Sequence, residues 1–209
     1  MRIVAVRTGE SRAGDRLIDQ ALCLRARVFQ GRLEWNVSTG NGREFDEYDQ
    51  LGPTYILATD DSCLQVIGCA RLLPGDGPTM LADTFPQLLD DRAMPRGRHI
   101  VESSRFCVDT SLQSSTGARG LHQATMSLFA GILEWGLDNR CTEVVTVTDV
   151  RIERIFGRAG LPFERLGSPQ AIGNTIAVAG TIPVTSDNAA RVRPVGYRSL
   201  IELGWDVAA

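Results

Sequence analysis

One arginine near the N-terminus strongly constrains how this chain can fold. In the stretch LCLRARVFQGRLEW, helical geometry places Arg25 on the same face as Ile18, Leu22 and Phe29, within an arc of about 60°. Arg27 falls on the opposite side of that helix, where a charge can remain in water. Because an unpaired buried charge costs several kcal/mol, Arg25 requires an anionic partner from a distant part of the chain or from a ligand.

The charge composition argues against nucleic-acid binding and excludes several kinds of catalytic and metal site. The 209 residues carry 22 basic and 25 acidic side chains, a net charge of −3, which gives nucleic acid no electrostatic reason to bind. All the basic side chains are arginine, so a phosphate-loop lysine, a Schiff-base lysine and a lysine general base are excluded. His99 and His122 are the only histidines, so a histidine-rich metal site is excluded and we expect no bound metal.

The cysteine pattern and the hydropathy predict a cytoplasmic protein. The five cysteines are an odd number without a C-x-x-C pair, and they lie in apolar segments, as small core residues of a reduced protein do. The N-terminal MRIVAVRTG alternates like a strand and lacks the continuous apolar region of a signal peptide. No apolar run reaches the roughly 18 residues that span a bilayer, so no membrane association is expected.

The order of periodic segments predicts one α/β domain over residues 1–209, with a mixed central sheet flanked by helices. Strands are predicted for RIVAVRT, for the hairpin pair TYILATD and LQVIGCARLL, for HIVESSRFCVD and for EVVTVTD. Helices are predicted for residues 15–30, for residues 120–139 after a glycine loop TGARG, and from Asp149 as N-cap to Gly160. The tail is expected to add one or two strands and a short helix.

Charged residues occupy several positions where the pattern expects apolar ones. Besides Arg25, they come from the acidic segment EFDEYD and from two predicted strands: Asp46, Asp49, Arg71, Glu102 and Arg105. Each alone could be a solvated surface charge. Together, arginines and carboxylates at interior positions predict a shared cleft in which they neutralise one another, which supplies the partner that Arg25 requires. Metal binding by the acids alone is disfavoured, because EFDEYD lacks the ligand spacing of a calcium loop and the arginines would oppose a cation.

The strand ESSRFCVD requires an irregularity. Glu102 and Arg105 have opposite parity, so a regular strand would point them to opposite faces of the sheet. Both can face one cleft only if the strand, at about residues 100–108, carries a bulge, which we predict near Ser103 and Ser104. The backbone N–H groups that such a bulge leaves unpaired could hold a pantetheine amide or an oxyanion.

With these residues in place, the sequence resembles the acyl-homoserine-lactone synthases, the autoinducer synthases of bacterial quorum sensing. The resemblance covers most of the chain and is carried by LRARVFQGRLEW, FDEYD, GCARLLP, DTFP and ESSRF, at Arg25, Phe29, Trp35, Asp46, Asp49, Arg71, Phe85, Glu102 and Arg105. It implies an acyltransferase with a fold similar to the acetyl-CoA-dependent N-acetyltransferases. The implied substrates are S-adenosylmethionine and a fatty acyl thioester, normally on acyl carrier protein, with acyl-CoA as the alternative donor.

The resemblance also implies roles for individual residues. Glu102 would remove a proton from the substrate amine, which attacks the thioester, and Arg105 would orient Glu102. The substrate carboxylate would then displace methylthioadenosine, without a metal or a cofactor, since S-adenosylmethionine is itself a substrate. The other motif residues would build the substrate pocket, because arginines suit the carboxylate while acids and aromatic rings suit the cationic end. Two more residues of the Glu102 strand are assigned to this pocket, Ser104 and Phe106.

The later strand VTVT places two hydroxyls on one face, those of Thr146 and Thr148. Threonine packs well in sheets, so plain β-propensity also explains the pair. Among similar synthases, a threonine resembling Thr148 accompanies 3-oxo-acyl substrates, whose keto oxygen needs a donor. On that resemblance we expect a 3-oxo-acyl chain.

The helix after Asp149 carries Arg151, Arg154 and Arg158 at i, i+3 and i+7, on one side. Ordinary solvated charges would show the same spacing. Carrier proteins are acidic, and an enzyme of negative net charge needs a local basic face to bind one. The resemblance therefore favours these arginines as the docking surface for acyl carrier protein.

Two other functions stay open. An N-acetyltransferase that uses acetyl-CoA usually holds the pyrophosphate with a Q/R-x-x-G-x-G/A loop, but here Gln113 would require glycine at Thr116. A non-catalytic sensor that binds S-adenosylmethionine is the second alternative, and the presence of Glu102 beside Arg105 argues against it. Whether thioester is consumed distinguishes the enzymes from the sensor.

Overall fold

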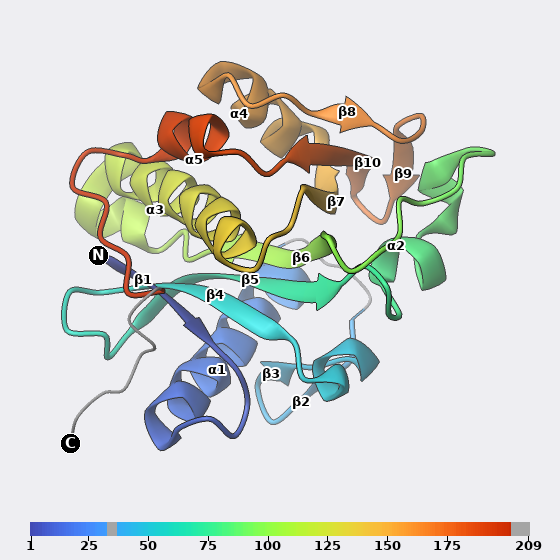
Figure 1. Ribbon diagram of the computed structural model, residues 1–209. Helices are drawn as coiled ribbons and strands as arrows, with labels where there is room; N and C mark the ends of the chain where they lie inside the picture. Colours follow the sequence, from blue (N-terminus) through green and yellow to red (C-terminus); the bar gives the residue numbers. More distant parts are fainter. Residues whose placement is uncertain (33–36, 202–209) are drawn as a thin grey trace.

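A computed structural model of the chain describes residues 1–32 and 37–201. Its centre is an eight-stranded sheet in the order β1-β4-β5-β6-β7-β10-β8, with β9 also paired with β10 (Figure 1). Neighbouring strands are antiparallel except β6 and β7, which are parallel. The strands are β1 (Arg2–Val6), β4 (Thr54–Thr59), β5 (Val66–Pro74), β6 (Ile100–Val108), β7 (Glu143–Asp149), β8 (Glu164–Arg165), β9 (Gln170–Ile172) and β10 (Thr175–Pro183).

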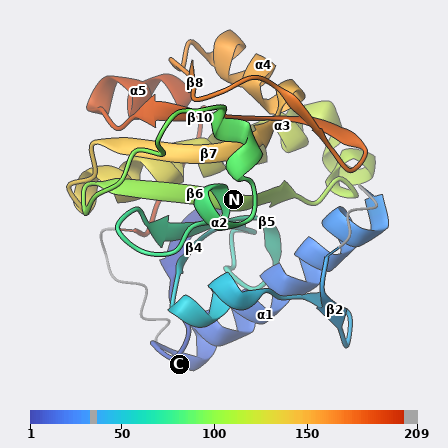
Figure 2. The same cartoon turned by 90° about the vertical axis from the view of Figure 1, so that its right-hand side faces the viewer.

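Helices cover both faces of this sheet (Figures 1 and 2). Helix α1 and the short helix α2 lie on one face, and α3, α4 and α5 lie on the other. A two-stranded hairpin and two 3₁₀ turns lie in the connections. The elements are α1 (Arg12–Arg25), α2 (Met80–Asp83), α3 (Leu112–Asp138), α4 (Val150–Ala159), α5 (Ser186–Val192), the hairpin β2 (Thr39–Gly40) and β3 (Arg43–Glu44), and the 3₁₀ turns Glu47–Leu51 and Pro86–Leu89.

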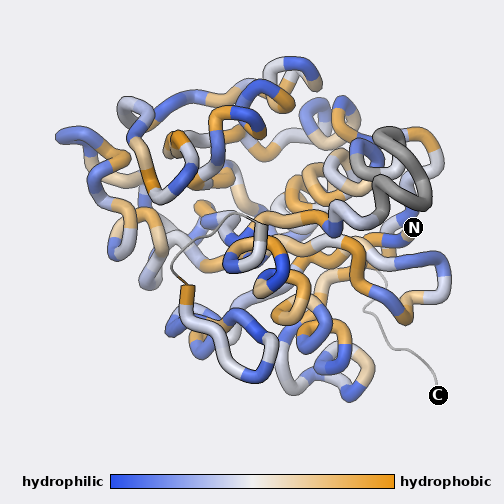
Figure 3. Tube along the Cα trace, turned by 180° about the vertical axis from the view of Figure 1, so that it is seen from behind, coloured by the Kyte–Doolittle hydropathy of each residue, from blue (hydrophilic) through white to orange (hydrophobic). Residues whose placement is uncertain are grey.

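Two apolar cores hold the helices to the sheet. The apolar stripe of α1, with Leu17 and Leu24, packs on Val4 and Tyr55 of the sheet, which is the amphipathic pattern visible in the sequence. A larger core on the opposite face includes Phe129 of α3. Figure 3 shows hydrophobic colour along much of the central strands and hydrophilic colour on many of the outer turns.

Strands β6 and β7 part in the middle of the sheet. Their parallel pairing ends at Ser103 opposite Thr146, although β6 continues to Val108 and β7 to Asp149. The divergence opens the sheet beyond Ser103 and Thr146. Beyond this point the backbone N–H and C=O groups of β6 and β7 do not pair with one another, so they are available to other partners.

The predicted bulge exists, but it lies further along β6 than expected. Ser104 pairs with Arg71 and Cys107 pairs with Cys69, so Arg105 and Phe106 together oppose a single residue of β5, and Arg105 has a φ of +53°. The prediction near Ser103 and Ser104 was therefore wrong in position. It was right in consequence, because the bulge turns Arg105 to the face that also carries Glu102.

Most predicted elements are confirmed, and the predicted limits of two helices are wrong. Strand β7 and helix α4 have the predicted limits, with Asp149 as N-cap and Gly160 ending the helix in the left-handed conformation. Helix α3 begins at Leu112, so the predicted glycine loop TGARG is helical. Helix α1 ends at Arg25 and continues as a π-helix over Ala26–Arg32. Within the described residues, no helix is both long and apolar enough to cross a lipid bilayer.

Candidate active site

Three arginines and three carboxylates form one buried ionic cluster on the α1 face of the sheet. They come from the end of α1, from adjacent positions of β5 and β6, and from the acidic EFDEYD segment: Arg25, Arg71, Arg105, Glu44, Asp46 and Asp49. The formal charges of the six groups sum to zero. This neutrality lets the cluster exist inside the protein, where an uncompensated charge would be strongly destabilising.

Arg25 lies at the centre of this cluster and is fully buried. Its Nε donates to Glu44 Oε2 at 2.5 Å, and its two terminal nitrogens donate to Asp49 Oδ1 and Oδ2 at 2.8 and 2.9 Å. Burial alone would lower the pKa of Arg25, but the hydrogen bonds and charges of Asp49 and Glu44 raise it above its ordinary value. The partner that the sequence demanded is thus the chain itself.

Asp49 has two structural tasks. It forms a capping box with Asp46, in which Asp46 accepts from the backbone N–H of Asp49 and Asp49 accepts from that of Asp46. It also accepts hydrogen bonds from the two arginines and, at 2.6 Å, from the Tyr55 hydroxyl. Burial acts to raise the pKa of Asp49, but the hydrogen bonds and charge of Arg25 outweigh it, so the pKa lies well below its ordinary value.

Arg71 and Arg105 connect the cluster to β6. Arg71 pairs with both Asp46 and Asp49, and its Nε donates to the Ser104 hydroxyl at 3.2 Å. Arg105 pairs with Asp46 at 2.7 Å and with Glu44 at 3.0 Å. Its guanidinium lies 5.6 Å from the centroid of the Phe29 ring, which the π-helical turn after α1 presents. Arg105 is the least buried of the three arginines.

Glu102 lies outside the ionic cluster, although it is almost completely buried. Its carboxylate accepts from the backbone N–H groups of Met80 at 2.8 Å and Leu81 at 2.7 Å, at the start of α2. The expectation that Arg105 orients Glu102 is therefore wrong, because Arg105 is bound to Glu44 and Asp46. Burial raises the pKa of Glu102 above its ordinary value, even though the two N–H groups oppose this shift. A carboxylate of raised pKa is a better proton acceptor.

Met80 contacts both Glu102 and the arginines. Its sulfur accepts from Arg71 at 3.1 Å and from Arg105 at 3.3 Å, while its backbone N–H holds Glu102. Local sequence patterns do not single out Met80, nor Tyr55. Glu44 had a readable signal, since it stands two residues before Asp46 in the acidic segment.

A cleft of about 610 Å³ runs along the diverging strands. Phe29, Phe85, Glu102 and Arg105 line it on the α1 face, and residues of α3 and α4 line it on the other face. Consecutive residues of β6, among them Glu102 and Ser103, line the same cleft although they point to opposite faces of the strand. The cleft therefore passes through the sheet between β6 and β7.

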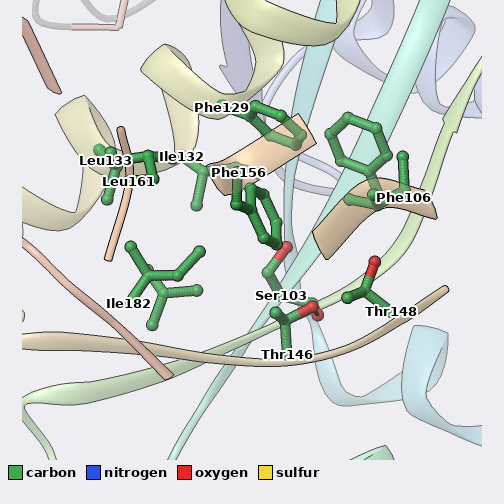
Figure 4. A pocket seen from close by; sticks show the side chains of 12 residues that line it. Ser103, Phe106, Phe129, Ile132, Leu133, Thr146, Thr148, Phe156, Leu161 and Ile182 are labelled. Atoms are coloured by element: carbon green, nitrogen blue, oxygen red, sulfur yellow. Dashed lines mark hydrogen bonds between the residues drawn. The ribbon is translucent and has the colours of Figure 1, made fainter. Parts of the chain in front are cut away.

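A small apolar pocket of about 30 Å³ continues from this cleft on the α3 face (Figure 4). Phe106 stacks on Phe129 with ring centroids 5.0 Å apart, and Phe129 contacts Phe156 at 4.9 Å, so three rings form one wall. Thr146 and Thr148 lie on the other side, as Figure 4 shows. A hydrocarbon chain that entered through the cleft would find an apolar environment here.

The remaining predicted residues divide between the cleft and the surface. Arg151 lines the cleft, whereas Arg154 and Arg158 are exposed on α4. Trp35 lies outside the described residues. Among the described residues, no group of histidine, cysteine, aspartate and glutamate side chains has the arrangement of a metal site.

Comparison with known sequences identifies the family. The chain matches the family model described as autoinducer synthase over residues 10–192. An acyl-homoserine-lactone synthase of Agrobacterium fabrum is 51% identical over 209 residues, which cover 100% of this chain and 98% of that protein. A probable acyl-homoserine-lactone synthase of Sinorhizobium fredii is 54% identical over 178 residues, which cover 85% of each.

Solved structures give the same result. The AHL synthase LasI matches with a TM-score of 0.81 at 35% identity, over 91% of this chain and 93% of that one. BjaI, described as a CoA-dependent acyl-homoserine lactone synthase and solved with SAM and isopentyl-CoA, matches with a TM-score of 0.81 at 25% identity, over 94% and 92%. A putative N-acetyltransferase of Lactobacillus plantarum, at 16% identity and a TM-score of 0.55, shares the fold alone.

The fold and the site together define an acyltransferase. The sheet opens between two parallel strands, with a buried carboxylate at the opening and an apolar pocket beyond it, an arrangement compatible with transfer of an acyl group to an amine. The chain belongs to the autoinducer synthase family. The activity that its relatives carry in their names is acyl-homoserine-lactone synthesis, and this chain is an enzyme of that class.

Proposed function

We propose that this enzyme makes an N-acyl-L-homoserine lactone from S-adenosylmethionine and an acyl thioester, and releases methylthioadenosine. The observation that carries the proposal is the environment of Glu102. It is a buried carboxylate of raised pKa at the wall of a large cleft, and that cleft continues into an apolar pocket. The substrate amine would occupy the cleft beside Glu102, and the acyl chain would occupy the pocket.

The reaction proceeds in two steps with balanced atoms. Glu102 accepts a proton from the ammonium group of S-adenosylmethionine, directly or through a water, and the free amine attacks the thioester carbonyl, so that an amide forms and a thiol leaves. The carboxylate of the same substrate then attacks its own γ-carbon. The carbon–sulfur bond breaks with its electron pair on sulfur, which gives the lactone and neutral methylthioadenosine.

Arg105 is proposed to bind the substrate carboxylate. It is the arginine of the cluster that lines the cleft, and Glu44 and Asp46 hold it in position against Phe29. Arg25 and Arg71 are fully buried and do not line the cleft, so they act on substrate through the cluster. Phe29 and Phe85 supply aromatic surface for the sulfonium end.

The acyl donor is proposed to be acyl carrier protein rather than free CoA. Arg151, Arg154 and Arg158 are exposed on α4, and Arg151 also lines the cleft that the thioester must enter. Replacing Arg154 and Arg158, which do not line the cleft, by glutamate should raise the KM for acyl carrier protein, because an acidic partner loses its basic docking face. The KM for acyl-CoA should change much less. Arg12→Glu, at an exposed position of α1 on the opposite face, is the matched control.

The acyl chain is proposed to carry a 3-oxo group. Thr148 lines both the cleft and the apolar pocket, and within the described residues its hydroxyl has no hydrogen-bond partner. The hydroxyl of Thr146, in contrast, donates to the backbone carbonyl of Ser103 at 2.8 Å. Of the two predicted threonines, Thr148 is therefore the one that is available to a keto oxygen.

Mass spectrometry of a single incubation tests the function. Purified protein would meet S-adenosylmethionine and a panel of acyl-carrier and acyl-CoA thioesters, beside a Glu102→Gln variant. The proposal expects acyl-homoserine lactone and methylthioadenosine together, both reduced by roughly 10²–10⁴-fold in the variant. Acyl transfer without methylthioadenosine would indicate a general N-acyltransferase. No turnover with any donor would indicate a sensor, and either result would overturn the proposal.

A further inference from the structure

Ser103 carries a hydroxyl at the cleft wall whose role the functions described so far do not explain. The residue is 5% exposed and follows Glu102 on β6, at the last paired position before the strands diverge. Within the described residues its hydroxyl makes no hydrogen bond, whereas its carbonyl accepts from Thr146. Since Ser103 lines both the cleft and the apolar pocket, its free hydroxyl is accessible from these cavities and is available to a ligand.

The neighbouring hydroxyls have partners in the protein. Ser104, the next residue, points to the opposite face, where Arg71 donates to its Oγ at 3.2 Å. Thr146, which faces Ser103 across the two strands, donates to backbone. Ser103 and Thr148 are thus the two hydroxyls at this point of the cleft that remain available to a ligand.

Ser103 lies at the junction between the cleft and the apolar pocket. The cleft and the apolar pocket have four lining residues in common: Ser103, Phe106, Thr148 and Ile152. A chain that extends from the reacting carbonyl beside Glu102 into the apolar pocket must pass between them. Figure 4 shows the side chains of Ser103 and Thr148 on one side of the pocket, with the aromatic rings of Phe106, Phe129 and Phe156 on the other. The junction is polar along one side and apolar along the other.

We infer that Ser103 is a specificity-determining residue, whose hydroxyl donates to an oxygen on the acyl chain close to the thioester. This inference rests on the proposed function and extends it. A ketone oxygen has two lone pairs and can accept one hydrogen bond from Ser103 and a second from Thr148. An unsubstituted methylene at the same place would cover both hydroxyls and leave them unpaired, and sites of this kind discriminate strongly against the analogue that lacks the polar group.

The test compares two donors of equal chain length, one 3-oxo-acyl and one unsubstituted, with wild type and with Ser103→Ala. Loss of one hydrogen bond should lower kcat/KM for the 3-oxo donor by roughly 2- to 12-fold. The value for the unsubstituted donor should stay equal or rise, since the unpaired hydroxyl has gone. The double variant Ser103→Ala with Thr148→Val should reduce the preference further.

Thr175→Val is the matched control. Thr175 is also buried and lines the same cleft, but its hydroxyl donates to the carbonyl of Ile172 at 3.1 Å, so the variant should affect both donors equally. Equal effects of Ser103→Ala on the two donors, or no effect, would overturn the inference while lactone formation continued. Absence of lactone with every donor in the wild-type protein would overturn the proposed function, and the inference with it.

Discussion

Replacing Arg25 by methionine should strongly destabilise the protein. Methionine has a similar length and fits an apolar stripe, so the change mainly removes charge. It leaves two arginines with three carboxylates in the buried cluster. Glu44 loses one hydrogen bond of 2.5 Å, and Asp49 loses two, of 2.8 and 2.9 Å. Breaking a buried ion pair on one side costs about 3–5 kcal/mol, which corresponds to a fall in Tm of roughly 6–20 °C for a domain of this size.

Arg27 provides a control of the same residue type on the same helical segment. Its side chain is 60% exposed, and it contacts Asp109 at 3.3 Å. An exposed pair of this kind contributes at most about 1 kcal/mol, so Arg27→Met should lower Tm by less than about 4 °C. Urea unfolding followed by circular dichroism measures both variants against wild type. If the free energies of unfolding of the two variants agreed within about 1 kcal/mol, the reasoning about Arg25 would be refuted.

Three further predictions concern pH and the acyl pocket. Because burial raises the pKa of Glu102, amide formation should decline on acidification at a pH above the ordinary glutamate value of about 4.3, and a pH–rate profile of Glu102→Gln should lack that limb. The pKa of Asp49 is lowered in the folded state, so the stabilisation from this carboxylate is complete above its unfolded pKa of about 3.9 and is lost as pH falls from there through the lower folded pKa. The urea midpoint of Asp49→Asn should therefore depend less on acid pH than that of wild type. Phe156→Leu should enlarge the apolar pocket and shift lactone products, measured by mass spectrometry, towards longer chains. Phe163→Leu should not, because Phe163 contacts Phe156 at 5.4 Å but does not line the pocket.

The ionic cluster illustrates what sequence reasoning can reach. A guanidinium in an apolar stripe demands anions, and the acids of EFDEYD were the available ones. The structure pairs Arg25 with Glu44 and Asp49 from that segment. Helix α4 was equally predictable, because an aspartate N-cap and a left-handed glycine are local signals that lie at its two ends.

Other features depend on contacts that no local pattern carries. The bulge at Arg105 is set by the register of β6 against β5, where Ala70 faces two residues. Glycine costs only about 1 kcal/mol within a helix, which a long helix such as α3 outweighs, so TGARG misled the prediction of its start. The donors that hold Glu102 are backbone N–H groups, which every residue except proline possesses and which therefore leave no trace in the sequence.

The misplaced expectation about Glu102 has a chemical consequence. A direct ion pair with Arg105 would stabilise the carboxylate and lower its pKa, which would make it a weaker base. In the structure, the arginines pair with three other carboxylates, and the charge of Arg71 opposes the effect of burial on the pKa of Glu102 without outweighing it. Glu102 is held in place by neutral amides, which orient it without cancelling the effect of burial on its pKa. The ionic cluster thus serves the site in two ways, since it presents one guanidinium to the cleft and supplies that guanidinium with carboxylate partners other than Glu102.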